Sequence, residues 1–204
     1  MRVKYVSRVS AFAVVAVSLA LAAAAETKSN KLSRVSIRNF GCINENYYRG
    51  AQPQKQEYAE LASLGVKTVI DLQEDGEANE KQMVELNGMK FVRFLMNTTD
   101  RPDSKIVTQF LKLVDDPANQ PVFVHCHGGR HRTGVMTAVY RLTHDGWTPD
   151  QAYSEMKQYE FGKGFGHGAL KAYVYDYFAS LDPKKTPAGK ESIKAAIGDG
   201  NPKK

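Results

Sequence analysis

Apolar and polar positions alternate along the chain with two different periods, which predict helices interleaved with short strands. Apolar residues spaced three and four apart share one helix face, and they predict helices over 53–64, 78–87 and 104–114. Short β-branched and aromatic runs predict strands over 40–43, 47–50, 66–72, 89–96 and 122–124. Because helices alternate with strands, we expect an α/β fold in which helices flank a central, mostly parallel sheet.

The last third of the domain has a helical pattern. Thr133 begins a run with apolar residues at helical spacing, and a further apolar stripe predicts a last helix over 170–181. Between them, Thr148 is expected to cap a helix whose first residue is Pro149, because proline lacks the N–H that the first turn leaves unpaired. The segment 161–168 contains four glycines. We interpret it as a plain connection between helices rather than as part of a site.

The two ends of the chain differ in composition from the middle. Arg2, Lys4 and Arg8 precede an almost wholly apolar run and three alanines, which together predict a secretory signal peptide over 1–25, cleaved after Ala25. The run is short for a membrane span of about twenty residues, so we expect a secreted or periplasmic protein with no stable membrane insertion after cleavage. Residues 26–38 read as a loose polar lead-in, residues 39–182 as one domain, and 183–204 as a disordered basic tail.

The net charge becomes small once these ends are set aside. The formal charge of +6 includes three cations of the signal peptide, which leaves +3 for a chain that starts at Glu26. The tail holds six lysines and only two carboxylates, Glu191 and Asp199, so the domain itself is close to neutral. A nucleic-acid binder would carry a basic stripe on a folded face, and the sequence lacks one.

One stretch carries the chemistry, where the strand at 122–124 runs through a glycine-containing loop into the helix that Thr133 opens. Backbone N–H groups at a helix N-terminus lack intrahelical partners and lie at the positive end of the helix dipole, so such a loop can hold an oxyanion. Gly128 and Gly129 suit a backbone that approaches a ligand closely. Cys126 begins the loop, and the same N–H groups should lower the pKa of its thiol and make it a nucleophile.

Arg132 and Thr133 complete this set. Arg132 follows Cys126 by six residues, a separation that lets the chain return so that its planar guanidinium clamps two phosphate oxygens. The Thr133 hydroxyl can donate to the thiolate. A buried cysteine at a strand end is the alternative interpretation of Cys126, but it does not account for the surrounding residues.

The stretch from His125 and Cys126 to Arg132, Thr133 and Gly134 resembles the signature loop of the cysteine-dependent protein tyrosine and dual-specificity phosphatases, most of all their atypical plant and fungal members and bacterial relatives. Residues 46–53 and 64–72 are similar to that family's opening segments. The resemblance implies a dual-specificity-phosphatase-like fold, hydrolysis through a phosphocysteine and no cofactor. It also implies that His125 supports the loop, although a satisfied core histidine is the plainer interpretation. The positions that the family turns toward the substrate are here His127, Gly128, Gly129, Arg130 and His131, with Thr133.

The family also needs an acid that protonates the leaving group, and the loop at 97–103 offers two carboxylates. Asp100 lies within the loop, whereas Asp103 stands where a helix N-cap is expected. We predict Asp100 as the acid. Asn97, which has no carboxyl proton to give, occupies the position where some relatives carry their aspartate.

The predicted substrate is a phosphorylated protein or an inositol phosphate. Arg130 and His131 beside Arg132 suggest a highly anionic partner, unless Arg130 pairs with an acidic neighbour. The alternatives are a phosphate-binding module without turnover, an inositol pyrophosphate phosphatase that needs no general acid, and a sulfur-transfer enzyme. We predict no metal, because His125, His127 and His131 lie within the anion-binding loop, and we expect a monomer.

Only two cysteines are present, and an exported protein often joins such a pair in a disulfide. Cys42 could pair reversibly with Cys126, or it could be a small residue of the first strand. We favour the strand residue.

Overall fold

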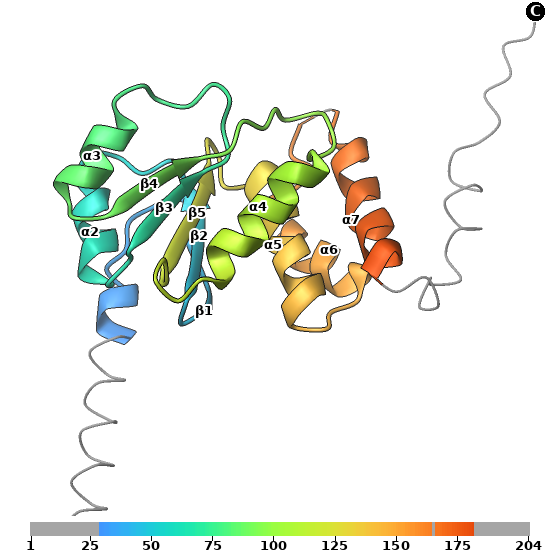
Figure 1. The fold of residues 1–204 in the computed structure, drawn as a ribbon, viewed down its shortest axis with the longest axis horizontal. Coiled ribbons are helices and arrows are strands. Elements are labelled where there is room, and N and C mark those ends of the chain that lie inside the picture. Colours follow the sequence, from blue (N-terminus) through green and yellow to red (C-terminus); the bar gives the residue numbers. More distant parts are fainter. Residues whose placement is uncertain (1–28, 165, 182–204) are drawn as a thin grey trace, which may run out of the picture.

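The computed structural model describes residues 29–164 and 166–181, and its central feature is a five-stranded sheet (Figure 1). The strands are β1 (Gly41–Asn44), β2 (Tyr47–Ala51), β3 (Thr68–Asp71), β4 (Lys90–Arg93) and β5 (Val122–Cys126). They lie in the order β1-β2-β5-β3-β4, with β1 antiparallel to β2 and the other neighbours parallel. The mostly parallel α/β sheet predicted from the sequence is therefore confirmed.

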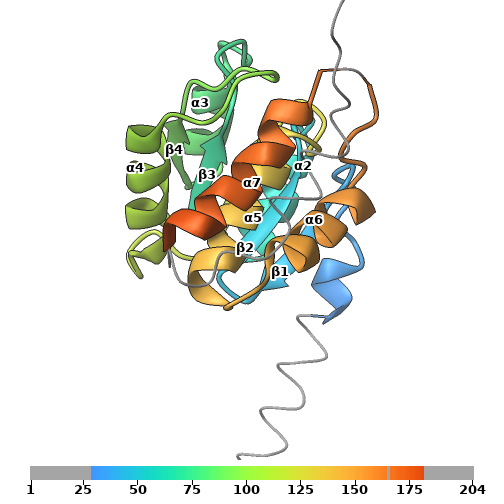
Figure 2. The ribbon, with the colours of Figure 1, turned by 90° about the vertical axis from the view of Figure 1, so that its right-hand side faces the viewer.

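Helices cover both faces of the sheet. On one face lie α2 (Glu57–Ser63) and α3 (Glu80–Leu86), and on the other lie α4 (Ser104–Asp115) and α5 (Arg132–His144). An outer layer, α6 (Pro149–Gln158) and α7 (Gly168–Leu181), packs on α5, and both lie in front of it in Figure 2.

Alternation along β5 decides which way the chemically important residues point. Val122 and Val124 pack into the core that α4 and α5 share, whereas Phe123 packs into the core under α2 and α3. Successive side chains of a strand point to opposite faces. Cys126 therefore belongs to the α5 side, and His125 stacks with Phe123 on the other side, with ring centroids 5.6 Å apart.

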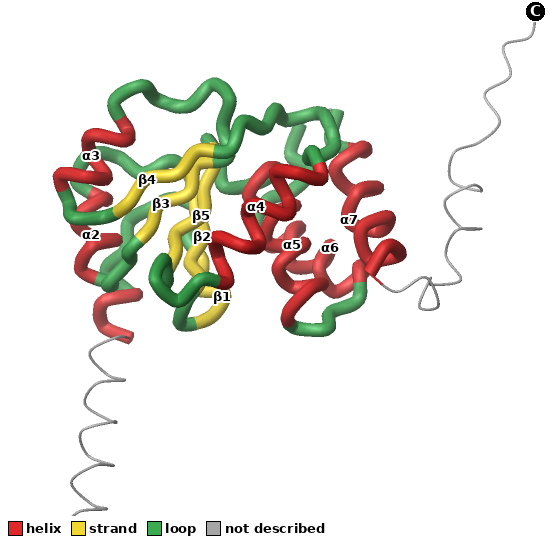
Figure 3. Tube along the Cα trace, viewed as in Figure 1, coloured by secondary structure: helices red, strands yellow, loops and turns green. Residues whose placement is uncertain are grey.

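The parallel strands end at one edge of the sheet, and the loops that follow them meet there. The loops after β3 and β4 lie together along the top of Figure 3, on the side where β5 passes into α5. In parallel sheets ligands bind in the crevice outside the carboxyl ends of the strands. The fold therefore brings residues from three separate loops to Cys126.

The predicted elements are confirmed, with ends that shift by a few residues. The largest shift is at α2, which starts at Glu57 rather than at Pro53. Thr148 caps α6 as expected, and its hydroxyl accepts from the Gln151 amide while the Gln151 side chain accepts from the Thr148 amide.

The loose lead-in expected over 26–38 is wrong for the described residues 29–38. Residues 29–32 are helical, and Ile37 is buried with only 3% of its surface exposed. The Ser36 amide and hydroxyl both donate to the Glu60 carboxylate of α2. Ser36 thus ties the segment to α2, and its few apolar residues join the core under α2 and α3.

The predicted signal peptide and the predicted tail lie outside the described residues. Within them, no helix combines the length and apolar character needed to cross a membrane.

The two cysteines lie too far apart to pair. Cys42 in β1 is opposite Tyr48, which is opposite Phe123, three residues before Cys126. Two strand spacings of about 4.8 Å and three residues of about 3.3 Å separate them, whereas bridged cysteines have Cα atoms within about 7 Å. No disulfide joins them, and Cys42 is the strand residue that we favoured.

Candidate active site

The loop that joins β5 to α5, here called the signature loop (residues 126–132), is held from outside by its carbonyl oxygens. The Asn39 side-chain amide donates to the carbonyls of Gly128 and Gly129, at 3.2 and 2.9 Å, and the buried Arg49 guanidinium also donates to Gly129. The Gln52 backbone N–H donates to the His127 carbonyl at 3.3 Å. Peptide units whose carbonyls face outward turn their N–H groups toward the centre, as an anion-binding loop requires.

Gly129 could not be replaced in this loop. Its backbone has a φ of 63°, and a side chain there would collide with the backbone of Gly50 in β2. The close approach brings the loop against the strand that carries Arg49. The glycine predicted to permit a tight loop is thus required both by its conformation and by its neighbour.

Cys126 is almost completely buried at the base of the signature loop, with 3% of its surface exposed. Burial alone would raise the pKa of its thiol, but the Thr133 hydroxyl and amide hold that pKa below its ordinary value. The charge of Arg132 acts in the same direction. The buried Thr133 hydroxyl makes no hydrogen bond with the described residues, so its proton is available to the sulfur. The pKa of the Cys126 thiol is thus lowered, in the direction that activation by Thr133 and Arg132 requires.

The Arg132 guanidinium lies beside the signature loop with 4% of its side chain exposed. Its Nη1 donates at 3.0 Å to both the Met96 carbonyl and the Asp75 carboxylate, whereas its buried Nε has no partner among the described residues. The loops after β4 and β3 thus fix the guanidinium from two directions. The Nε–H and the Nη2 group make no hydrogen bond with the described residues, so they remain available for an anion held in the loop.

The sequence analysis missed Asp75. This residue follows β3 by four positions, and the hydrogen bond from Arg132 holds the pKa of its carboxyl below the ordinary value. Its loop is fixed at Gly76, where a side chain would collide with Asp71 and Arg93. The signal available in the sequence was its place just after a buried parallel strand, since such strands end at a common edge.

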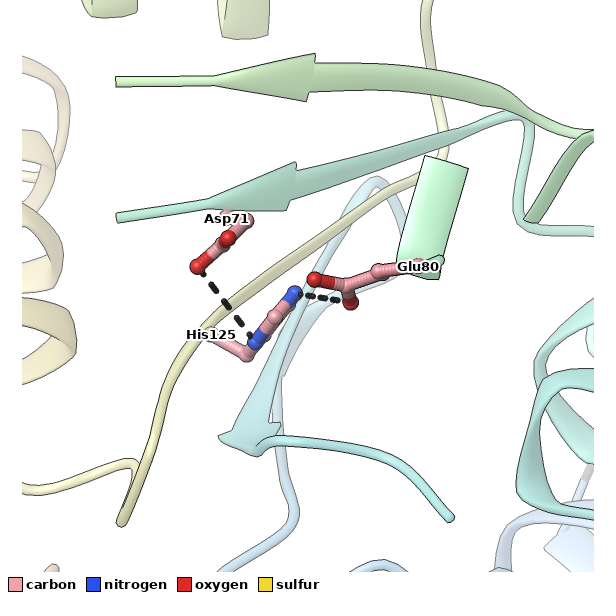
Figure 4. Close-up of side chains that lie close together, drawn as sticks. All are labelled: Asp71, Glu80 and His125. Atoms are coloured by element: carbon pink, nitrogen blue, oxygen red, sulfur yellow. Dashed lines mark ion pairs between the residues drawn. The ribbon is translucent and has the colours of Figure 1, made fainter. Parts of the chain in front are cut away.

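A buried ion network lies under the signature loop, on the side of the sheet to which His125 points (Figure 4). His125 Nε2 lies 2.9 Å from Glu80 Oε1, and its Nδ1 lies 4.0 Å from Asp71 Oδ1. The Arg93 guanidinium adds a cation, 2.6 Å from Asp71 and 3.5 Å from Glu80. Burial opposes protonation of His125, but the hydrogen bond to Glu80 and the charges of both carboxylates raise its pKa above the ordinary value. His125 therefore lies within a buried network with Asp71, Glu80 and Arg93, where a residue that supports the loop is expected.

Asp71, Glu80 and His125 also have the donor types of a metal site, with ligand atoms within 4.8 Å of one another. Arg93 already supplies a cation to both carboxylates, and burial raises the pKa of Asp71 above its ordinary value. Arg93 thus already neutralises part of the negative charge, so the cluster fits a support for the signature loop better than a site for a further cation.

The loop expected to carry the acid is organised by Asn97. Its side-chain oxygen accepts from the amides of Thr99 and Asp100, at 3.0 and 2.7 Å, and its nitrogen donates to the Asp100 carboxylate at 2.7 Å. Asn97 cannot give a proton, but it fixes the exposed carboxylate that can. Asp103 caps α4 as predicted, because its carboxylate accepts from the Lys105 amide at 2.7 Å.

The rim of the signature loop carries less free positive charge than the sequence suggested. Arg130 Nε lies 2.8 Å from the Glu160 carboxylate, so the alternative in which Arg130 pairs with an acidic neighbour is confirmed. Burial and the nearby His167 lower the pKa of His131 to about 4, which leaves its ring neutral near pH 7. His127, also in the signature loop, is exposed to solvent.

The segment 161–168 borders the site, so its interpretation as a plain connection is wrong. Phe161 packs edge-on against His131, and His167 stacks on the same ring with centroids 3.4 Å apart. The chain reverses through glycines with positive φ, and this reversal returns His167 to the signature loop. Residues thirty and thirty-six positions apart meet here, which no local pattern indicates.

Comparison with known proteins places this geometry in context. Residues 21–169 match the profile of the family described as PTP-NADK, DSP-PTPase phosphatase fused to NAD+ kinase. The chain is similar to the dual specificity protein phosphatase TpbA of Pseudomonas aeruginosa, with 34% identity over 139 residues, 67% of this chain and 61% of that one. It is also similar to the inositol diphosphatase SIW14 of Saccharomyces cerevisiae, with 28% identity over 131 residues, 61% of this chain and 46% of that one. The chain therefore matches less than two thirds of either relative.

Solved structures give the same picture. The catalytic core of SIW14 from S. cerevisiae, in complex with citrate, superposes with a TM-score of 0.62 at 25% identity, over 76% of this chain and 94% of that one. A TpbA variant of P. aeruginosa in complex with phosphotyrosine superposes with a TM-score of 0.58 at 26% identity, over 79% and 91%.

Proposed function

The chain belongs to the DSP-PTPase family of cysteine-dependent phosphatases, and from this premise we propose that it hydrolyses phosphate monoesters of the phosphotyrosine type through a phosphocysteine at Cys126. The observation that carries the proposal is the environment of the sulfur. The hydroxyl and amide of Thr133 and the charge of Arg132 lower the pKa of a buried thiol, and the Arg132 guanidinium lies beside the loop with an unpaired Nε. This arrangement suits a nucleophile under a bound phosphate.

In the first step the Cys126 thiolate attacks phosphorus, the new P–S bond forms, and the ester P–O bond breaks. The leaving oxygen takes a proton from the Asp100 carboxyl group, which becomes a carboxylate. Arg132 and the amides of the signature loop stabilise the charge on the three remaining phosphate oxygens.

In the second step water attacks the phosphocysteine. Its proton passes to the Asp100 carboxylate, the P–S bond breaks, and inorganic phosphate and the Cys126 thiolate are released. The Thr133 hydroxyl assists because its hydrogen bond stabilises the thiolate as a leaving group. The cycle needs water and the phosphate ester as its only reactants.

The charges at the rim support a phosphotyrosine-type substrate over an inositol pyrophosphate. Arg130 pairs with Glu160, which also pairs with Lys163. Asp75 forms an ion pair with Arg132. A ligand with many phosphates would gain little from cations that are already paired, and it would meet the exposed Asp75 carboxylate. A single phosphate on an aromatic ring needs only the signature loop.

Inositol pyrophosphate hydrolysis is the second candidate. The names of SIW14 and of the rice relative DSP2, each 28% identical, assign those proteins an inositol diphosphatase activity. Asn97 supports this candidate as well, since a phosphoanhydride leaving group departs without a general acid. The two candidates differ in how strongly the rate depends on Asp100.

The test is hydrolysis of phosphotyrosine peptide and of an inositol pyrophosphate by the same preparation, with a chelator present and with Cys126→Ser as the inactive control. The proposal expects phosphotyrosine turnover that the chelator does not affect and that Cys126→Ser abolishes. Preferred turnover of the pyrophosphate would replace it with the second candidate. Full activity of Cys126→Ser would rule out the phosphocysteine mechanism.

We also propose that the protein works outside the cytoplasm, as a secreted or periplasmic enzyme. The support is the pattern of residues 1–25, a basic start followed by an apolar run and three alanines. N-terminal sequencing of the protein purified from cell fractions tests this. A mature chain that starts at Glu26 in the exported fraction is expected, and an uncut chain in the cytoplasm would overturn it.

A further inference from the structure

The segment between α6 and α7 is anchored on the signature loop at its first residues. Glu160 binds Arg130 at 2.8 Å, and the Phe161 ring packs edge-on against His131 with centroids 5.4 Å apart. A side chain on Gly134 would touch Phe161, so the ring also lies against the first turn of α5. The start of this segment is therefore fixed relative to the anion-binding loop.

His167, at the end of the same segment, lies between the signature loop and the loop that carries Asp100. On one side its ring stacks on His131, with centroids 3.4 Å apart and an interplanar angle of 18°. On the other side its Nδ1 lies 3.1 Å from the Thr98 carbonyl oxygen. A carbonyl oxygen only accepts hydrogen bonds, so His167 must carry a proton on Nδ1.

Thr98 belongs to the turn that fixes Asp100. Asn97 closes this turn through three hydrogen bonds, two from the amides of Thr99 and Asp100 and one to the Asp100 carboxylate. A displacement of the Thr98 carbonyl would therefore displace the Asp100 carboxylate with it.

The other anchors of this loop lie at its ends. Arg132 donates to the Met96 carbonyl before the turn, and Asp103 caps α4 after it. Arg101 pairs with Asp176 of α7, but about half of each side chain is exposed, so this ion pair is weak. Among the described residues, the hydrogen bond that reaches 98–100 from outside the loop is that of His167.

We propose that His167 is a positioning residue that holds the Asp100 turn against the signature loop, through its stack on His131 and its hydrogen bond to Thr98. The inference rests on the proposed function, because it takes Asp100 as the acid. The contacts of His167 are with His131, Phe161 and Thr98, and none of them involves the Cys126 sulfur. Loss of His167 should therefore affect protonation of the leaving group and leave phosphate binding unchanged.

Two substitutions separate the stack from the hydrogen bond. His167→Phe keeps an aromatic ring on His131 but has no donor for Thr98, whereas His167→Asn keeps a donor near the position of Nδ1 and loses the ring. His144→Phe is the matched control. His144 also packs on a ring, that of Tyr140, and it pairs with Asp115 of the neighbouring helix α4, away from the signature loop.

The kinetic test compares phosphotyrosine with 2,4-dinitrophenyl phosphate, whose leaving group departs without an acid. We expect His167→Phe to lower kcat on phosphotyrosine by about tenfold, with little change on the dinitrophenyl ester and in the inhibition constant of vanadate. His167→Asn should recover most of that loss, and His144→Phe should match the natural protein. Equal losses on both substrates, or no loss on either, would overturn the proposal.

A second measurement does not depend on catalysis, so it separates failure of this inference from failure of the proposed function. Amide hydrogen exchange of residues 97–101 should be faster in His167→Phe than in the natural protein, with the exchange of α5 unchanged. If the natural protein shows no phosphatase activity, the proposed function fails, and this comparison still tests the contact. Unchanged exchange at 97–101 would show that His167 does not hold the turn.

Discussion

The Asp75 carboxylate accepts a hydrogen bond of 3.0 Å from the Arg132 guanidinium, although 72% of the Asp75 side chain is exposed and only 4% of the Arg132 side chain. The pair therefore joins an exposed, solvated anion to a buried cation. A phosphate that binds in the signature loop must share Arg132 with this carboxylate or displace it. Asp75 thus acts as an internal competitor for the site.

Asp75→Asn should accordingly tighten the binding of vanadate and phosphate. The gain should be at most about fivefold, because an ion pair open to water on one side is worth at most about 1 kcal/mol. Inhibition constants for both anions measure it. Glu74→Gln is the matched control, since it removes the same charge from the neighbouring exposed residue. Weaker anion binding in Asp75→Asn would instead mean that Asp75 mainly orients Arg132.

Arg132→Lys should lose activity by about a hundredfold or more, because an ammonium cannot offer a planar pair of N–H groups to two phosphate oxygens. It would also lose a donor to Met96 or to Asp75, which both bind Nη1. Steady-state kinetics on an aryl phosphate measure the loss, and thermal unfolding checks the fold. Kinetics like those of the natural protein would place Arg132 outside the site.

Asp100→Asn should reduce the rate by about a hundredfold or more on phosphotyrosine, and far less on an activated aryl phosphate, because a general acid matters most for a basic leaving group. Asp103→Asn should leave both rates nearly unchanged, since asparagine also caps helices. The ratio of kcat values on the two substrates is the measurement. If Asp103→Asn shows the selective loss, the two roles are reversed. If neither does, a phosphoanhydride becomes the favoured substrate.

Glu80→Gln should change how stability depends on pH. The folded pKa of His125 lies above its unfolded value of about 6.5, so its contribution is complete below that pH and is lost as pH rises through the folded pKa. The groups that face His125 are Glu80, Asp71 and Cys126, with Arg93 beyond the carboxylates. Without Glu80 the decline in stability above about pH 6.5 should flatten. Urea unfolding at several pH values measures this, and an unchanged profile would contradict the network.

The signature loop could be predicted from the sequence because Cys126, Arg132 and Thr133 lie within eight consecutive residues, in an order that only a few chemistries need. The strands and helices followed from period two and from spacings of three and four. The rest depends on long-range register. Asp75 reaches Arg132 because β3 and β5 are neighbours in the sheet, and Glu160 reaches Arg130 because α6 folds back on α5.

Burial also changed two interpretations that residue type alone suggested. His131 is neutral near pH 7 because the protein covers it and because His167 stacks on it, a contact across thirty-six positions. Residues 29–38 look polar enough to be loose, yet Ser36 binds Glu60 and Ile37 fills the core under α2 and α3. In both cases the deciding neighbour is distant in the sequence.

The central claim is that catalysis passes through a phosphate bound to the sulfur of Cys126. Rapid acid quenching during turnover of an aryl phosphate, followed by mass spectrometry of the peptides, tests it most directly. The mechanism predicts a phosphate adduct on Cys126, absent from Cys126→Ser and more abundant when Asp100→Asn slows the attack of water. Turnover without an adduct on Cys126, or continued turnover by Cys126→Ser, would contradict it.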